Sequence, residues 1–135
     1  IKQKKSENPI EYIIPCMESV LNNTYGIIVY QEQIMMLSRL IAGFSRSESA
    51  LLRMGIGMFK KEILPTLRNQ FIRGGIKNGY GKTALEKLWN EMESKGKYVF
   101  NKSHSVCYTW LAYQMAYLKA NYSKEFVQVM EKYHS

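Results

Sequence analysis

The chain has 135 residues, and its 19 lysines and arginines outnumber its 11 acidic residues, which gives a formal net charge of +8. Every acidic residue is a glutamate, and the sequence contains no aspartate. Two-metal phosphoryl transfer relies on converging carboxylates, with aspartate prominent among them, so the chain is a poor candidate for a complete metal-dependent active site. With 46% hydrophobic and 22% charged residues, the composition excludes wholesale disorder and indicates one modest core.

The two cysteines, Cys16 and Cys107, form no CxxC motif and are too few for a disulfide framework, so we expect reduced thiols in a cytoplasmic protein. The first residues are charged with no apolar stretch behind them, and no signal peptide is expected. The longest mostly apolar stretch, 106–118, is shorter than the roughly 20 residues of a membrane span, and no membrane partner is expected. The chain does not begin with Met and is expected to be a piece of a larger protein.

Residues 1–12 are polar and are predicted to be a linker or truncated end that precedes the folded region, 13–135. Ile13 and Ile14 precede a proline and are expected to be extended. The β-branched and aromatic run 27–30 is either a short strand or the start of the next helix. From 31 to 44, apolar residues recur at spacings of three and four, which predicts an amphipathic helix ending near Gly43.

Three helices are predicted in the middle of the chain. Ser47 is expected to cap a short helix that Gly55 and Gly57 end. The next helix stacks Ile63, Leu67 and Phe71, has Pro65 either in its first turn or at a kink, and ends at the glycines of 74–79. Thr83 and Glu86 have the spacing of a capping box. The helix that this box opens is predicted to bury Leu85, Leu88, Trp89 and Met92.

The last third of the chain is predicted to contain a basic loop, 95–104, a longer helix, 105–121, and a final helix capped by Ser123. Either Ser103 or Ser105 is expected to cap the longer helix. The overall prediction is a mainly α-helical, irregular domain with short extended segments.

Two constellations are candidates for binding anions. The first, 51–61, is predicted to be a helix end running into a glycine-punctuated turn beside Arg53, Lys60 and Lys61, an arrangement that suits a phosphate. Its structural alternative is a solvated turn. The second is the loop 95–104, in which basic side chains alternate with Tyr98 and Phe100, so cations could meet phosphates while rings stack on bases. Its alternative is a run of lysines that only aids solubility.

His104 and Cys107 are three residues apart and could share a helix face, which raises a Cys/His nucleophile or a metal pair. A metal site needs three or four ligands, and the other histidine, His134, stands at the C-terminus. We therefore expect no metal ligands in the chain. Cys107, Trp89 and Trp110 are instead expected to be core residues.

Several blocks follow one another in a characteristic order: TYGIIVYQEQIM (24–35), AGFS (42–45), LLR (51–53), RGG (73–75), KNG (77–79), YVFNKSH (98–104), AYQ (112–114) and YLKA (117–120). The series resembles the bacterial DNA polymerase III alpha subunits, the C-family replicative DNA polymerases, from Ile10 to Met130. The sequence around Pro15 and Cys107 is similar to Bacteroidetes-like versions.

The resemblance implies that the chain is a portion of the fingers domain of a DNA-directed DNA polymerase that acts in DNA replication. The palm with its catalytic aspartates and Mg²⁺, the thumb and the clamp-binding region would lie elsewhere in the parent, so the chain alone should be inactive and hold no cofactor. Implied partners are the incoming dNTP, primer-template DNA, the rest of the polymerase chain and, through absent regions, the sliding clamp and other replisome subunits.

The resemblance also assigns site residues, none of them catalytic and none a metal ligand. Those implied to face the dNTP phosphates are Arg53, Lys60, Lys61, Asn101, Lys102, Ser103 and His104. Tyr98 and Phe100 are implied to lie near the base or sugar. The chain departs from the family where Met54, Met58 and Phe59 replace cations. Either the parent is a divergent paralogue, or Lys60 and Lys61 take over with a shifted turn.

A second hypothesis from another class stays open at this point: a stand-alone basic helical module that binds nucleic acid or a protein without catalysis. The net charge and the aromatic-basic loop fit this alternative equally well.

Overall fold

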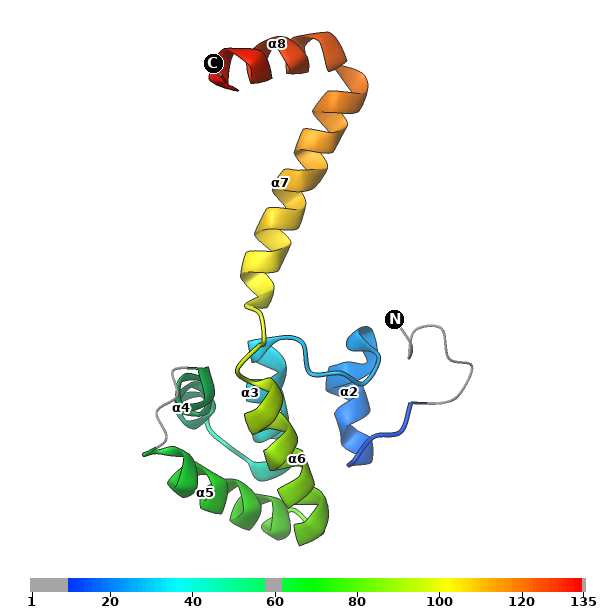
Figure 1. Cartoon of the computed structure of the whole chain (residues 1–135). Helices are drawn as coiled ribbons and strands as arrows, with labels where there is room; N and C mark the ends of the chain where they lie inside the picture. Colours follow the sequence, from blue (N-terminus) through cyan, green and yellow to red (C-terminus); the bar gives the residue numbers. More distant parts are fainter. Residues whose placement is uncertain (1–9, 58–61, 135) are drawn as a thin grey trace. The chain divides into compact units, whose positions relative to one another are not determined.

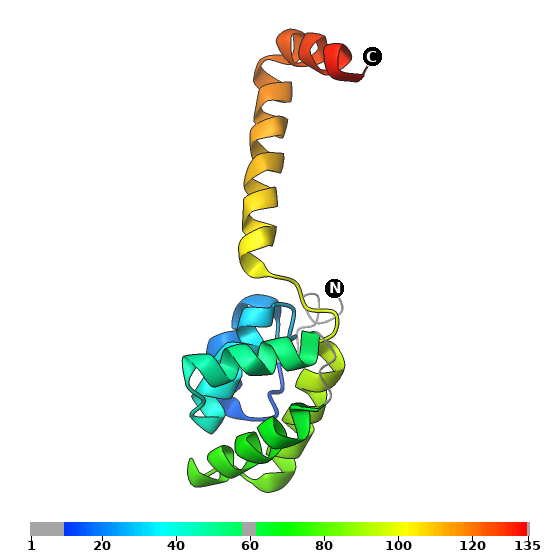
Figure 2. The same ribbon diagram turned by 90° about the vertical axis from the view of Figure 1, so that its left-hand side faces the viewer.

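The computed structural model describes residues 10–57 and 62–134, and the chain divides between Phe100 and Asn101 into two compact units. Unit 1 is Ile1–Phe100 and unit 2 is Asn101–Ser135. Figures 1 and 2 show both units as helices joined by short connections. The described residues are mainly helical, which confirms the predicted fold class.

In the described residues of unit 1, three short helical segments are followed by four longer helices. The short ones are η1 (Pro15–Met17), α2 (Glu18–Leu21) and η2 (Asn22–Thr24). The longer ones are α3 (Gln31–Ala42), α4 (Arg46–Gly57), α5 (Leu64–Lys77) and α6 (Lys82–Lys95). Helix α3 packs against α4 and α5, and α5 packs against α6.

The core of unit 1 lies where these helices meet, and it includes the four residues that the periodicity of α6 predicts. Phe71 of α5 is fully buried, and its ring lies 5.6 Å from that of Trp89 and 6.2 Å from that of Phe44. The predicted core residues of α6, namely Leu85, Leu88, Trp89 and Met92, are at most 1% exposed. Burial of such a set supplies most of the driving force for folding.

Helix α4 begins at a different residue from the predicted one. Ser45, not Ser47, closes its N-terminus: the Ser45 backbone N–H donates to Glu48 Oε2 at 2.8 Å, and the Glu48 N–H donates to Ser45 Oγ at 3.1 Å. Of the two glycines predicted to end the helix, Gly55 lies inside it and Gly57 is its last residue. Gly55 is buried because Ile63 and Leu64 pack against it: a Cβ there would lie 3.2 Å from each of their side chains.

Helix α5 has Pro65 in its first turn, where a missing N–H costs no helical hydrogen bond. The prediction that Gly74 and Gly75 end this helix is wrong, since it continues to Lys77. A Cβ on Gly74 would lie 2.1 Å from the carbonyl oxygen of Ala42, and one on Gly75 would lie 2.4 Å from the side chain of Leu85. These glycines therefore allow close helix approach, and it is Asn78 and Gly79 that follow the helix end.

The capping box predicted at Thr83 is also wrong. Helix α6 starts one residue earlier, at Lys82, and its N-cap Gly81 has no side chain to offer. Glu86 lies 4.0 Å from the Lys82 ammonium as an exposed i,i+4 ion pair.

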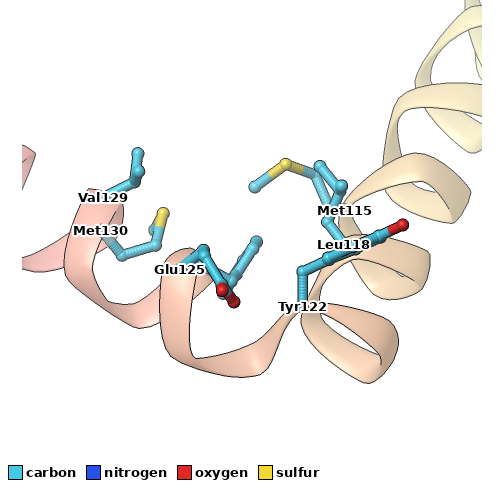
Figure 3. A pocket seen from close by; sticks show the side chains of 7 residues that line it. Met115, Leu118, Tyr122, Glu125, Val129 and Met130 are labelled. Atoms are coloured by element: carbon cyan, nitrogen blue, oxygen red, sulfur yellow. The ribbon is translucent and has the colours of Figure 1, made fainter.

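Unit 2 consists of α7 (Lys102–Asn121) and α8 (Ser123–His134). Helix α7 starts three residues before the predicted Ser105, and α8 includes Ser123 as its first residue. The two helices enclose an open pocket of about 240 Å³ (Figure 3). Its lining is mostly apolar: Met115, Leu118, Tyr122, Glu125, Phe126, Val129 and Met130.

None of the described side chains of unit 2 is buried. Trp110 is 61% exposed and Cys107 is exposed, so the expectation that both belong to a core is wrong. The physical reason is that α7 has only α8 to pack against within its unit, and two helices cannot enclose a side chain on all sides. Among the described helices, none combines the length and apolar composition needed to cross a bilayer.

Candidate functional site

The candidate site is built on a backbone junction that joins the start of α3 to Phe100, in the connection between α6 and α7. Tyr30 and Phe100 form an isolated parallel β-bridge. The Phe100 N–H donates to the Val29 carbonyl and the Gln31 N–H donates to the Phe100 carbonyl, each at 2.9 Å. Segment 27–30 is thus extended, and it leads into α3 rather than forming the helix itself. The junction brings together two blocks that lie about 70 residues apart in the sequence.

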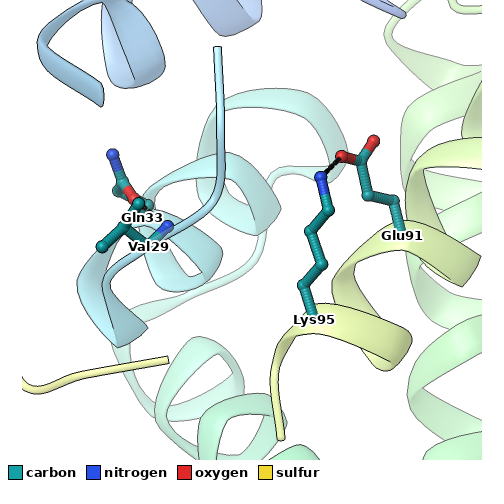
Figure 4. Close-up of polar contacts among 4 residues, drawn as sticks. All are labelled: Val29, Gln33, Glu91 and Lys95. Carbon is teal, nitrogen blue, oxygen red and sulfur yellow. Dashed lines mark hydrogen bonds and ion pairs between the residues drawn. The ribbon is translucent and has the colours of Figure 1, made fainter. Parts of the chain in front are cut away.

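The side chain of Gln33, which is 6% exposed, stabilises the junction. Its Oε1 accepts the backbone N–H of Val29 at 2.9 Å (Figure 4) and that of Tyr30 at 3.0 Å. Its Nε2 donates to Thr24 Oγ1 at 2.7 Å and to the Val20 carbonyl at 3.3 Å. One side chain therefore satisfies four polar groups and ties the extended segment to the preceding helices.

Arg53 of α4 lies at the same junction. Its Nη1 donates to the side-chain Oε1 of Gln31 at 3.2 Å, and both side chains are half-buried. Among the described residues, Arg53 forms no ion pair with a carboxylate. The positive end of a helix dipole repels a cation and attracts an anion, so a guanidinium beside the N-terminus of α3 creates a place where an anion is favoured.

The second constellation is not a single loop. Lys95 is the last residue of α6 and pairs with Glu91 (Figure 4), which neutralises part of the basic run. Tyr98 follows in a turn and is 81% exposed, and Phe100 in the bridge is 64% exposed. Both rings are therefore available for stacking.

The FNKSH block continues into the first turn of α7. Asn101 is the N-cap, and its Oδ1 accepts the His104 N–H at 3.0 Å, so neither Ser103 nor Ser105 is the predicted cap. Lys102, Ser103 and His104 form the exposed start of this helix. The His104 ring lies 4.4 Å from that of Tyr108, one turn further on.

The structure brings some of the predicted site residues together and divides others. Arg53 and Phe100 both contact Gln31 within unit 1, and Tyr98 is two residues before Phe100. The residues Asn101, Lys102, Ser103 and His104 belong to unit 2. Lys60 and Lys61 lie outside the described residues, as do Met58 and Phe59. Met54 is half-buried in α4.

Sequence reasoning missed Gln31 as a site residue. Gln31 lies in the YQEQ block (30–33). Its amide is neither charged nor aromatic, so the sequence alone does not mark it as a candidate for a phosphate site. Only the contact between distant segments identifies it.

Cys16 is half-buried and Cys107 is exposed, and neither forms a disulfide. In the described part of the chain, no three His, Cys or Glu side chains converge as a metal site would require.

Comparison with known proteins gives a consistent family. The family model for the bacterial DNA polymerase III alpha subunit finger domain matches residues 1–79. The DNA polymerase III subunit alpha of Aquifex aeolicus is 43% identical over 96% of this chain and 11% of its own length. The Halalkalibacterium halodurans protein is 43% identical over 93% of the chain, and the Bacillus subtilis protein 40% over 94%, each again over 11% of its own length. The chain thus spans about a tenth of these relatives.

Proposed function

Because the chain belongs to the family of bacterial DNA polymerase III alpha-subunit finger domains, we propose that it is the fingers portion of a DNA-directed DNA polymerase that acts in DNA replication. Within this polymerase it binds the triphosphate of the incoming dNTP. The observation that carries this role is the half-buried Arg53 at the N-terminus of α3, held by a neutral amide. No comparison favours the alternative of a stand-alone binding module.

The chemistry of Arg53 suits a triphosphate. A guanidinium has five N–H donors, and one of them is used by Gln31, so several remain for phosphate oxygens. Nucleotide transfer builds negative charge on the departing pyrophosphate, and a fixed cation there stabilises the transition state as well as the bound nucleotide. Mg²⁺ would be held by carboxylates of the palm, in the remainder of the polymerase chain, and would supply the metal-ion part of this stabilisation.

Asn101, Lys102, Ser103 and His104 are proposed to act at the same triphosphate, with Lys60 and Lys61 as further cations. The start of α7 suits such a role, since Lys102 and His104 stand in the first turn, where the helix dipole also favours an anion. Tyr98 and Phe100, both exposed, are proposed to contact the base or sugar of the nucleotide.

The remaining partners follow from the same proposal. The chain works with primer-template DNA and with the palm and thumb of its own polymerase, in the cytoplasm. Contacts with the sliding clamp and other replisome subunits are made by regions outside this chain.

The test is steady-state kinetics of the full-length polymerase that carries this chain, with two variants, Arg53→Ala and the double variant Lys102→Ala with His104→Ala. Each should raise the dNTP KM by about 10-fold or more, because charge-assisted hydrogen bonds to phosphate are lost. Lys119→Ala, a lysine in the last turn of α7, is the matched control. Unchanged KM and kcat in the first two variants would refute the assigned roles.

A further inference from the structure

Gln31 is the residue through which the two predicted anion-binding blocks meet. It is the first residue of α3, and its backbone N–H donates to the Phe100 carbonyl at 2.9 Å. Its side-chain Oε1 accepts from Arg53 Nη1 at 3.2 Å. Arg53 of the LLR block and Phe100 of the YVFNKSH block are therefore both hydrogen-bonded to Gln31.

The position of this side chain is fixed by the backbone on both sides. Tyr30, just before it, is bridged to Phe100 and has its N–H bound by the buried Gln33. After it, the chain enters the regular turns of α3. An acceptor mounted on such an anchored residue holds its donor in a narrow range of orientations, which is what pre-organisation of a binding group requires.

The chemical type of the acceptor matters as much as its position. Glu32 is the next residue in the first turn of α3, yet Arg53 donates to the amide of Gln31 and forms no ion pair with a described carboxylate. A carboxylate partner would neutralise the guanidinium, whereas a neutral amide orients it and leaves the full positive charge.

We propose that Gln31 is a positioning residue that orients the Arg53 guanidinium toward the triphosphate and leaves its charge uncompensated, an inference that rests on the proposed function. Gln31 itself does not touch the nucleotide. Its contribution passes through Arg53 and should vanish when Arg53 is removed.

A double-mutant cycle in the full-length polymerase tests this, with dNTP KM and kcat measured for Gln31→Ala, Arg53→Ala and the double variant. Gln31→Ala should raise KM by about 5-fold, the effect of one hydrogen bond, with kcat changed less. In the Arg53→Ala background the same change should have no further effect, since coupled residues are not additive. Gln70→Ala on α5, also a half-buried helical glutamine, should leave both constants unchanged.

Gln31→Glu separates orientation from charge. The glutamate keeps an acceptor at the same place but neutralises Arg53, so KM should rise at least as much as in Gln31→Ala while the melting temperature of the polymerase does not fall.

The outcomes distinguish this inference from the function on which it rests. If Arg53→Ala leaves KM unchanged, the proposed phosphate role of Arg53 fails. If Arg53→Ala raises KM but Gln31→Ala does not, or if the two effects add, the phosphate site stands and the positioning role of Gln31 is refuted. A purely structural role would lower kcat and melting temperature in both backgrounds, and that result would also overturn the inference.

Discussion

At the scale of single residues, the side chain of Gln33 hydrogen-bonds four polar groups at the junction. It binds two backbone N–H groups, one carbonyl and one hydroxyl while almost fully buried. An apolar residue of similar size would fill the same space but leave these groups without partners. Since the whole stability of a domain is only about 5–15 kcal/mol, such a loss is large.

We predict that Gln33→Met lowers the free energy of unfolding of the chain by about 2–4 kcal/mol, because buried backbone groups lose their partners. Urea unfolding followed by Trp89 fluorescence measures this, in a Trp110→Phe background so that one indole reports. Gln70→Met, at a half-buried position of α5, is the control and should change stability little. A Gln33→Met variant as stable as the parent would show that the four hydrogen bonds contribute nothing net.

Glu48 allows a prediction about pH. Hydrogen bonds from the Ser45 backbone N–H and then from its hydroxyl lower the pKa of the Glu48 carboxyl below its usual 4.5. The unfolded chain therefore takes up this proton at a higher pH than the folded chain does. The stabilisation is present above pH 4.5 and is lost as the pH falls through the lower pKa of the folded state.

Accordingly, Glu48→Gln should be less stable than the parent chain at neutral pH, and the difference should shrink as the pH is lowered below 4.5. Unfolding curves of both proteins at several pH values measure the difference. A difference that stays constant or grows toward acid pH would mean that the Ser45–Glu48 hydrogen bonds do not hold the carboxylate.

At the scale of elements, the crossing of α3 and α5 depends on Gly74. A Cβ at this position would lie 2.1 Å from the Ala42 carbonyl oxygen, and backbone cannot move aside as a flexible side chain can. The helices could accommodate it only by separating, which would expose part of the core around Phe71.

Gly74→Ala should therefore destabilise the chain by about 2 kcal/mol or more, although alanine is the better helix former. Gly57→Ala is the matched control, since it is also a helical glycine and a Cβ there meets no described atom within 4 Å. This control should be neutral or slightly stabilising. Thermal unfolding by circular dichroism compares them, and equal midpoints for the two variants would contradict the close approach.

These glycines also show what sequence could and could not predict about the elements. The periodicity of α3 and α6 is set by burial of one face, so their existence and core residues, Trp89 included, were predictable. Gly74 was predicted to end α5, because the sequence does not reveal that the backbone of Ala42 packs closely against it. Thr83 was predicted to be the N-cap of α6, because Thr83 and Glu86 have the spacing of a capping box. That spacing does not fix the first residue of the helix, which is Lys82.

Some residues of the candidate site could likewise be proposed from the sequence, and others could not. Charge, aromaticity and the family resemblance were enough to propose Arg53 and Phe100 as candidates. Gln31 could not be proposed in this way, since its part comes from a hydrogen bond to a residue 22 positions away and from a backbone contact with Phe100. The start of α7 at Lys102 was missed because two serines compete with Asn101 as caps, and only geometry selects among them.

At the scale of the whole molecule, the proposed binding role rests on unit 1 and on residues that are not metal ligands. The buried hydrophobic cluster comes entirely from unit 1, between Ile14 and Met92, and supports the junction at Gln31. The sequence has no aspartate, and in the described part no cluster of three potential ligands could hold a metal ion. A cation that binds a triphosphate lowers the barrier only when the attacking and leaving oxygens are also activated.

The purified 135-residue chain should therefore extend no primer, even with all four dNTPs and excess Mg²⁺ or Mn²⁺. A gel assay with a labelled primer-template measures this, with the full-length polymerase as the positive control. A trace of host polymerase is the obvious false positive, so any activity must be followed across an ion-exchange gradient. Incorporation that coelutes with this basic chain and is abolished by Arg53→Ala would show that it carries catalytic groups of its own.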